Sequence, residues 1–172
     1  ENKEMMKHQN QYPVIFITLK DLSRESMTLQ MEKFISTIWR VAENYSELLN
    51  SPYLSETEKE IFNRYKTMTA TESELRDSLY NLTLFLNKHY GKKTILLIDE
   101  YDVPLQSAYA HEYYDDMTMF IRNVFSSALK TNEALERGVL TGCLRIAKES
   151  IFTGLNNFTV RSITDKEGND CF

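Results

Sequence analysis

Unbroken apolar runs alternate along the chain with longer stretches in which apolar residues recur at helical spacing. Two of the runs, YPVIFITL (Tyr12–Leu19) and TILLIDE (Thr94–Glu100), are continuous rather than alternating. This pattern is typical of strands covered on both faces in a parallel sheet. A shorter run, GVLTG (Gly138–Gly142), predicts a third strand, and the alternating FTVRSIT (Phe158–Thr164) predicts an edge strand.

The segments between these runs predict helices. Apolar residues between Leu29 and Leu49 lie on one helix face, and Ser51-Pro52 ends that helix because proline cannot continue it. Two capping-box patterns begin further helices. Ser55 with Glu58 predicts a helix to about Tyr65, and Thr71 with Glu74 predicts one to about Tyr90, before Gly91. A last helix is expected over Asp116–Glu136.

This order of elements predicts an α/β fold, in which a parallel sheet is flanked by helices in three layers. The segment between the first two strands is longer than one crossover needs, so residues 28–90 are interpreted as a helical insertion. We treat residues 1–172 as a single, partial domain.

Composition narrows the possible functions. The 172 residues carry a net charge of −5, which gives no support for a nucleic-acid-binding surface. No apolar run approaches the length needed to cross a bilayer, and the polar opening ENKEMMKHQNQ is unlike a signal peptide. Cys143 and Cys171 lack metal-type spacing and are interpreted as reduced thiols. We therefore expect a cytoplasmic protein with no membrane partner.

The second apolar run ends in three carboxylates, Asp99, Glu100 and Asp102. In open parallel sheets, ligands bind beyond the carboxyl ends of the strands. Four aliphatic residues followed by Asp-Glu form the Walker B arrangement of nucleoside triphosphatases, where the first acid holds Mg²⁺ and the second orients the attacking water. The alternative is a strand that emerges into a solvated loop. Asp102, close to Pro104, is interpreted as turn chemistry.

The third apolar run places Thr141 at its carboxyl end, where a polar residue can hydrogen-bond the attacking water or the terminal phosphate. A threonine that satisfies its own turn is the alternative. Arg145 and Lys148 follow, and either can lie against a phosphate or belong to a solvated basic patch.

Two long motifs, LLIDEYDVPL (Leu96–Leu105) and RGVLTGCLRIAKESIFTGLNNF (Arg137–Phe158), together resemble the bacterial AAA-ATPase-like family. Its long members carry an N-terminal triphosphatase-type domain followed by a restriction-nuclease-like region. The resemblance implies a P-loop NTPase-like fold. It also implies that Asp99 is the Mg²⁺-associated, cofactor-binding acid, that Glu100 activates water, and that Thr141 is the sensor at the next strand tip. Arg145 falls where the family has a basic residue and is assigned to phosphate contact.

One departure from the family pattern concerns the phosphate-binding loop, GxxxxGK[ST], which occurs nowhere in the 172 residues. We expect that cropping removed this loop and one strand. Mg²⁺ and ATP are therefore expected as cofactors of the full-length protein, while the fragment alone is expected to bind ATP weakly and to be inactive. The strand edge left beside Gly138–Gly142 would then either be available for self-association or be covered by the termini of the chain itself.

Two other functions remain open at the level of sequence. One is a non-hydrolysing interaction scaffold with the same fold. The other is a carboxylate-metal nuclease or hydrolase that uses Asp99, Glu100 and Asp102 directly on a divalent ion.

Overall fold

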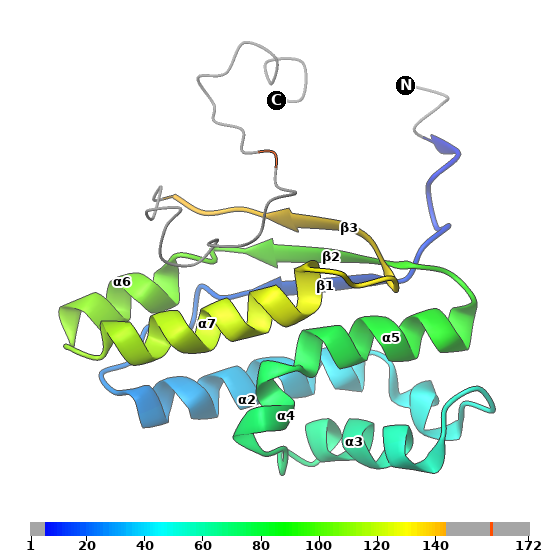
Figure 1. Cartoon of the computed structure of the whole chain (residues 1–172), viewed down its shortest axis with the longest axis horizontal. Helices are drawn as coiled ribbons and strands as arrows, with labels where there is room; N and C mark the ends of the chain where they lie inside the picture. The colour runs from blue at the N-terminus through cyan, green and yellow to red at the C-terminus, as the bar shows by residue number, and fades with distance from the viewer. Residues whose placement is uncertain (1–5, 144–158, 160–172) are drawn as a thin grey trace.

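A parallel three-stranded sheet forms the centre of the computed structural model, which describes residues 6–143 and 159. The strands are β1 (Val14–Thr18), β2 (Thr94–Asp99) and β3 (Leu135–Leu140), and they lie in the order β1-β2-β3 (Figure 1). Phe16 pairs with Leu97, which in turn pairs with Val139. The three apolar runs therefore form the predicted parallel strands, whereas the predicted strand Phe158–Thr164 lies outside the described residues apart from Thr159.

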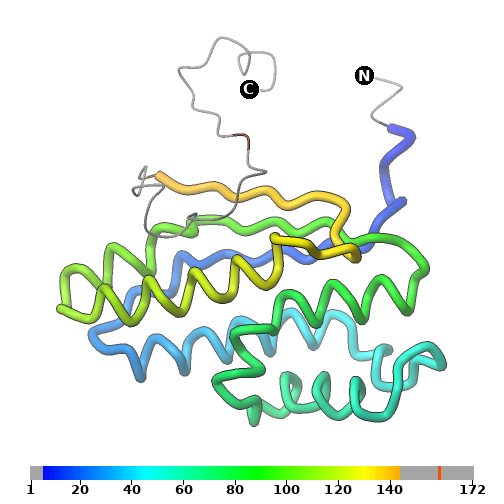
Figure 2. The backbone as a smooth tube through the Cα atoms, viewed as in Figure 1, coloured from blue at the N-terminus to red at the C-terminus, as the bar shows by residue number. Residues whose placement is uncertain are grey.

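Helices fill the space between the strands in the sequence. Between β1 and β2 the chain forms α2 (Met27–Glu43), the 3₁₀ helix η1 (Ser46–Asn50), α3 (Glu56–Lys66), α4 (Glu72–Arg76) and α5 (Ser78–Tyr90). Between β2 and β3 it forms α6 (Val103–Ala110) and α7 (Tyr114–Leu129). Figure 2 shows that β1 and β2 lie side by side although the whole helical insertion separates them in sequence. None of the described helices is long and apolar enough to cross a membrane.

The helices of the described residues lie on one face of the sheet (Figure 1). Alternate strand residues, such as Ile15 and Leu96, are fully buried in the hydrophobic core that this face shares with the helices. On the opposite face, Phe16 is 58% exposed and Val139 is 41% exposed. The unbroken apolar runs predicted cover on both faces, and the described part of the chain supplies it on one.

Side-chain caps explain where several helices begin. Ser55 and Thr71 each form a complete capping box, which confirms the predicted starts of α3 and α4. The single helix predicted from Thr71 to Tyr90 is instead divided at Asp77 into α4 and α5. Gly91 ends α5 with a left-handed φ of 64°, a conformation that glycine adopts without steric cost.

The predicted helix Asp116–Glu136 was wrong at its carboxyl end, because α7 stops at Leu129 and β3 begins at Leu135. The reason is turn chemistry at Asn132. Its Nδ2 donates to the Ala128 carbonyl at 2.8 Å, and its Oδ1 accepts from the Ala134 N–H at 3.0 Å. These bonds favour a turn over another helical turn, since asparagine offers the backbone an alternative to the helix ladder.

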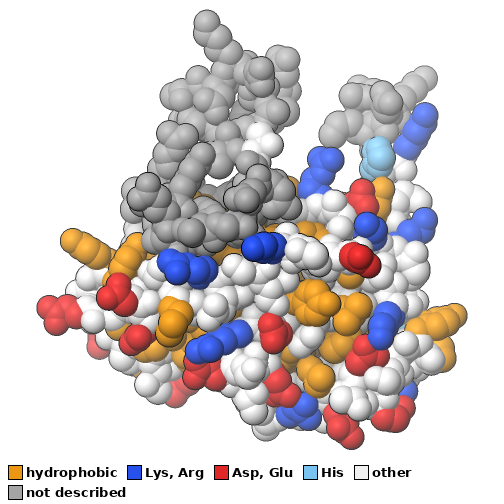
Figure 3. Space-filling model, in the orientation of Figure 1, with side chains coloured by type: hydrophobic (Ala, Val, Ile, Leu, Met, Phe, Trp, Pro, Cys, Tyr) orange, Lys and Arg blue, Asp and Glu red, His pale blue; other side chains and the backbone are white. Residues whose placement is uncertain are grey.

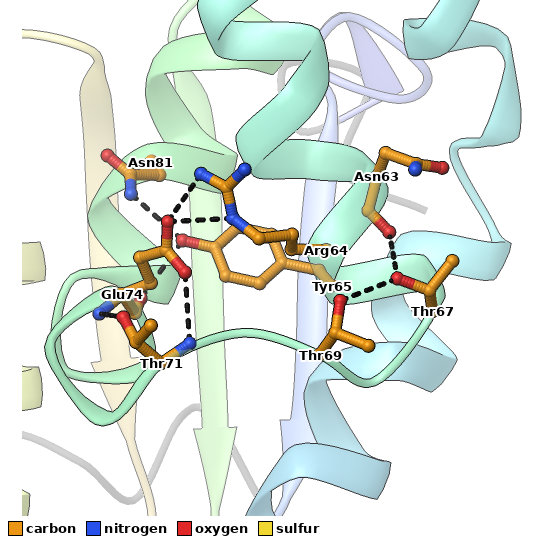
Figure 4. Close-up of polar contacts among 8 residues, drawn as sticks. All are labelled: Asn63, Arg64, Tyr65, Thr67, Thr69, Thr71, Glu74 and Asn81. Carbon is orange, nitrogen blue, oxygen red and sulfur yellow. Dashed lines mark hydrogen bonds and ion pairs between the residues drawn. The ribbon is translucent and has the colours of Figure 1, made fainter.

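A polar network joins α3, α4 and α5 within the helical insertion (Figure 4). The Arg64 guanidinium donates to Glu74 Oε1 from Nε at 2.9 Å and from a terminal nitrogen at 2.5 Å, while Glu74 also completes the capping box with Thr71. The buried Tyr65 hydroxyl donates to the Glu74 carbonyl at 3.0 Å and accepts from Asn81 Nδ2 at 2.9 Å. The network fixes α4 against its neighbours, which matters because a five-residue helix has little stability alone.

Candidate functional site

The carboxyl ends of the three strands meet at one edge of the sheet, because the strands are parallel. Asp99 is the last residue of β2 and is in register with Thr18, the last residue of β1. Thr141 follows directly after β3. The position beyond parallel strand ends is where open α/β sheets bind ligands.

Asp99 and Thr141 contact each other directly. Thr141 Oγ1 donates a hydrogen bond of 2.6 Å to Asp99 Oδ1. The backbone holds this geometry, because the Thr141 N–H donates to the Ile98 carbonyl at 2.9 Å and the Tyr101 N–H donates to the Thr141 carbonyl at 3.1 Å. The structure therefore brings together two of the residues predicted from the sequence. Asp99 ends β2 and Thr141 follows β3, and backbone hydrogen bonds hold these two chain segments together.

Glu100 marks the point at which the chain leaves the strand direction. Its φ is 53°, in the left-handed region that non-glycine residues rarely adopt. Four other described non-glycine residues adopt the same region, so this conformation marks a turn and does not by itself single out a site. Within the described residues, neither Asp99 nor Glu100 has an ion-pair partner, and both are partly exposed. These two acids are thus not held by neutralising contacts with the described helices.

Asp102 has a different role from the other two acids, because it is 1% exposed. Its Oδ2 accepts from Gln106 Nε2 at 2.7 Å, and its Oδ1 accepts from the Cys143 N–H at 3.3 Å. The loop after β2 is thereby joined to the loop after β3. A Cβ on Gly142 would lie 2.6 Å from Asp102 Oδ1, so this close approach requires glycine. Asp102 lies in a turn, as predicted, and it precedes α6.

Burial affects the aromatic residue beside this loop. Burial, and to a lesser extent the charge of Asp102, raises the pKa of the Tyr101 phenol above its ordinary value. The Tyr101 ring lies 2.7 Å from the position that a Cβ on Gly142 would occupy. The Tyr101 ring therefore packs against Gly142 in the loop that follows β3.

Sequence reasoning missed Thr18, which lies beside Asp99 in the sheet. Its Oγ1 accepts from the Lys20 N–H at 3.4 Å, a long contact on a partly exposed side chain. The sequence feature that could have identified Thr18 is a polar residue near the end of the first apolar run. It lies two positions after Phe16 and so on the same, exposed face of the strand. By contrast, Arg145, Lys148 and the segment 151–157 lie outside the described residues.

No cluster of three or more potential metal ligands occurs among the described His, Cys, Asp and Glu residues. Mg²⁺ at a nucleotide site uses one or two carboxylates together with phosphate oxygens and water. Asp99 fits that requirement, because Oδ1 is occupied by Thr141 and no described residue hydrogen-bonds its Oδ2.

The described residues form an α/β domain in which helices flank a three-stranded parallel sheet, and this arrangement is consistent with an incomplete P-loop NTPase-like fold. The model of the AAA-ATPase-like family, described as a predicted AAA-ATPase, matches residues 1–152. The chain therefore belongs to this family. No match was found among curated proteins or among solved structures.

Proposed function

We propose that this chain is the core of a nucleoside triphosphatase that binds and hydrolyses ATP with Mg²⁺. The observation that carries the proposal is the hydrogen bond between Thr141 and Asp99 at the carboxyl edge of the sheet. This bond joins a carboxylate and a hydroxyl that come from neighbouring strands. Neither Asp99 nor Glu100 forms an ion pair with a described residue. Membership of a family of predicted AAA-ATPases supports the same conclusion.

Asp99 is assigned to hold Mg²⁺ through the water molecules bound to the ion. The oxygen available for this contact is Oδ2, because Oδ1 accepts the hydrogen bond from Thr141. When bound, the ion neutralises charge that develops on the phosphate oxygens. The Thr141 hydroxyl donates to Asp99 and so restrains the carboxylate. Its oxygen can still accept a hydrogen bond, and we propose that it accepts one from the attacking water. Positioning of this kind, rather than covalent chemistry, dominates catalysis of phosphoryl transfer.

Glu100 is assigned to orient the attacking water and to accept its proton. Its left-handed φ of 53° shows that the backbone leaves the strand direction at Glu100. This turn supports the proposal that a second acid serves the same site as Asp99, because in a continued strand the two successive side chains would face opposite sides of the sheet. Arg145 is proposed to contact a phosphate, in keeping with the planar guanidinium group that suits such contacts.

These 172 residues lack a GxxxxGK[ST] loop, and so we propose that on their own they bind ATP weakly and turn it over poorly. Calorimetric titration with ATP and Mg²⁺ tests this directly. Micromolar affinity would contradict it. An ATP-dependent role also favours a cytoplasmic location, where ATP is abundant.

The decisive experiment measures phosphate release and nucleotide binding in a form of the protein that carries the family's phosphate-binding loop. Glu100→Gln should reduce the turnover number by about 100-fold or more while leaving nucleotide affinity nearly unchanged. Asp99→Asn should instead weaken Mg²⁺-nucleotide binding. Asp115→Asn is a matched control, because Asp115 is exposed on α7 and should retain full activity. Absence of phosphate release in the wild type would favour the non-hydrolysing scaffold, and release that is unchanged in both site variants would contradict the roles assigned to these two acids.

Self-association through β3 is a separate proposal. In the described part of the chain, the outer edge of β3 pairs with no other strand, and such edges are templates for pairing. Light scattering over a range of concentrations should then show a dimer. A monomer at every concentration would contradict this proposal without affecting the assignment of the strand-end site.

A further inference from the structure

A groove between α2, α4 and α7 lies on the helical layer, away from the strand-end site. Its volume is about 430 Å³, and its apolar lining is rich in methionine. Met27, Met31 and Ile35 come from α2, and Met119 and Phe120 come from α7. Asp99, in contrast, ends a strand of the sheet, and no residue of the strand-end site lines the groove.

The floor of the groove is buried, whereas its walls include exposed and partly exposed methionine side chains. Phe120 is 1% exposed and packs edge-on against Phe34, with ring centroids 5.1 Å apart. Met119, on the other hand, is 51% exposed, and Met27 and Met31 are partly exposed. Flexible methionine side chains on a surface can repack around the apolar side chains of a partner.

The rim of the groove is acidic. It carries Glu32, Glu72 and Asp116 against a single basic residue, Arg76. Arg76 is already paired with Glu72 at 2.6 Å, whereas Glu32 and Asp116 make no ion pair with any residue that the structure describes. The lining thus retains two uncompensated negative charges beside an apolar floor. Figure 3 shows acidic and basic side chains interspersed over the visible face of the helical layer, so the excess of acid is a local property of the residues that line the groove.

From this combination we infer that the groove binds an amphipathic helix of a partner protein whose apolar face is flanked by lysine or arginine. Helices dock into grooves of this kind through apolar side chains at helical spacing. Basic flanks would meet Glu32 and Asp116 and so guide the register. A second copy of this chain is disfavoured as the occupant, because its net charge of −5 would bring like charge to an acidic rim.

The first test maps binding of a synthetic basic amphipathic peptide, LKKLLKLLKKLLKL, by NMR of ¹³C-methyl methionine in the 172-residue protein. The methyl signals of Met27, Met31 and Met119 should shift on titration. Met68 is the internal control, because it is 44% exposed but does not line the groove. Absence of binding, or shifts of equal size at Met68, would overturn the inference.

The second test separates the groove from general charge attraction. E32K/D116K reverses the rim and should weaken binding of the lysine peptide by about tenfold. It should also strengthen binding of the counterpart LEELLELLEELLEL. E60K/E133K is the matched control, since it makes the same change in net charge at exposed positions outside the groove and should weaken binding less than about threefold.

Equal weakening by the two double variants would overturn the inference. If E32K/D116K does not fold, as judged by circular dichroism, the methionine mapping decides the question alone. Neither experiment depends on ATP hydrolysis, so failure here leaves the proposed function untouched.

Discussion

The substitution Tyr65→Phe, which removes one hydroxyl group from the helical insertion, should lower the free energy of unfolding. Tyr65 is 1% exposed, and its hydroxyl joins α3 to the Glu74 carbonyl of α4 and to Asn81 of α5 (Figure 4). Phenylalanine keeps the ring packing but leaves both polar partners without this contact. The substitution therefore separates the contribution of the Tyr65 hydroxyl from that of the packed ring.

The size of the effect follows from the two hydrogen bonds. Each contributes about 0.5–1.5 kcal/mol net, so the free energy of unfolding should fall by about 1–3 kcal/mol. Urea denaturation measures this change. With a slope of about 2 kcal/mol/M, the midpoint should move down by about 1 M. Tyr109→Phe is the control, because Tyr109 is 77% exposed and its loss should cost less than about 0.5 kcal/mol.

The pH dependence gives an independent check. Burial raises the pKa of the Tyr65 phenol far above its ordinary value of 10.0, against the opposing effect of the Asn81 hydrogen bond. The unfolded chain therefore loses this proton first, and the stabilisation by Tyr65 is complete below about pH 10 and is lost as the pH rises further. The stability difference between wild type and Tyr65→Phe should be constant from about pH 6 to 9 and should narrow above about pH 10.

A difference of less than about 0.5 kcal/mol at neutral pH would contradict this prediction, because it would mean that the Tyr65 hydroxyl contributes nothing beyond the packing of its ring. A difference that stays constant above pH 10 would refute the pKa argument alone.

Two further substitutions test the loop packing and the ion pair. Gly142→Ala should lower the free energy of unfolding by about 1–3 kcal/mol, because the new Cβ would lie 2.6 Å from Asp102 Oδ1 and 2.7 Å from the Tyr101 ring; an unchanged urea midpoint would contradict this. Glu74→Gln should make the acid-induced loss of stability shallower. The hydrogen bond from Arg64 lowers the pKa of Glu74 despite partial desolvation, so this stabilisation is present above the ordinary value of 4.5 and is lost as the pH falls. Parallel urea-midpoint curves for wild type and variant between about pH 3 and 5 would be the contrary result.

Much of the fold could be predicted because local signals agreed with the tertiary structure. The strand at Thr94 was evident from its unbroken apolar run, and Ser55 and Thr71 marked the starts of helices through capping boxes. The end of α7 was missed because Leu135 continues the helical apolar spacing, while the deciding turn chemistry at Asn132 involves only a few hydrogen bonds. Helix α6 was missed because it is short, with eight residues.

The candidate site was accessible to sequence reasoning only in part. The acids at the end of β2 stand out as charges after an apolar run, but Thr18 acquires its place beside Asp99 only through strand register. The contact between Asp102 and the Cys143 N–H joins residues 41 positions apart, and no local pattern encodes such a distance. Tertiary pairing of strands, rather than propensity, determines which polar residues meet at the strand ends.

We propose that Asp99 holds a divalent ion, and through it the nucleotide, at the carboxyl edge of the sheet. Paramagnetic Mn²⁺ in place of Mg²⁺, titrated together with ATP into the protein carrying a phosphate-binding loop, tests it most directly. The methyl NMR signals of Thr18 and Thr141 should broaden first, while that of Thr67, beyond α3, should stay sharp. Broadening that is absent at Thr18 and Thr141, or that is strongest at Thr67, would contradict the account.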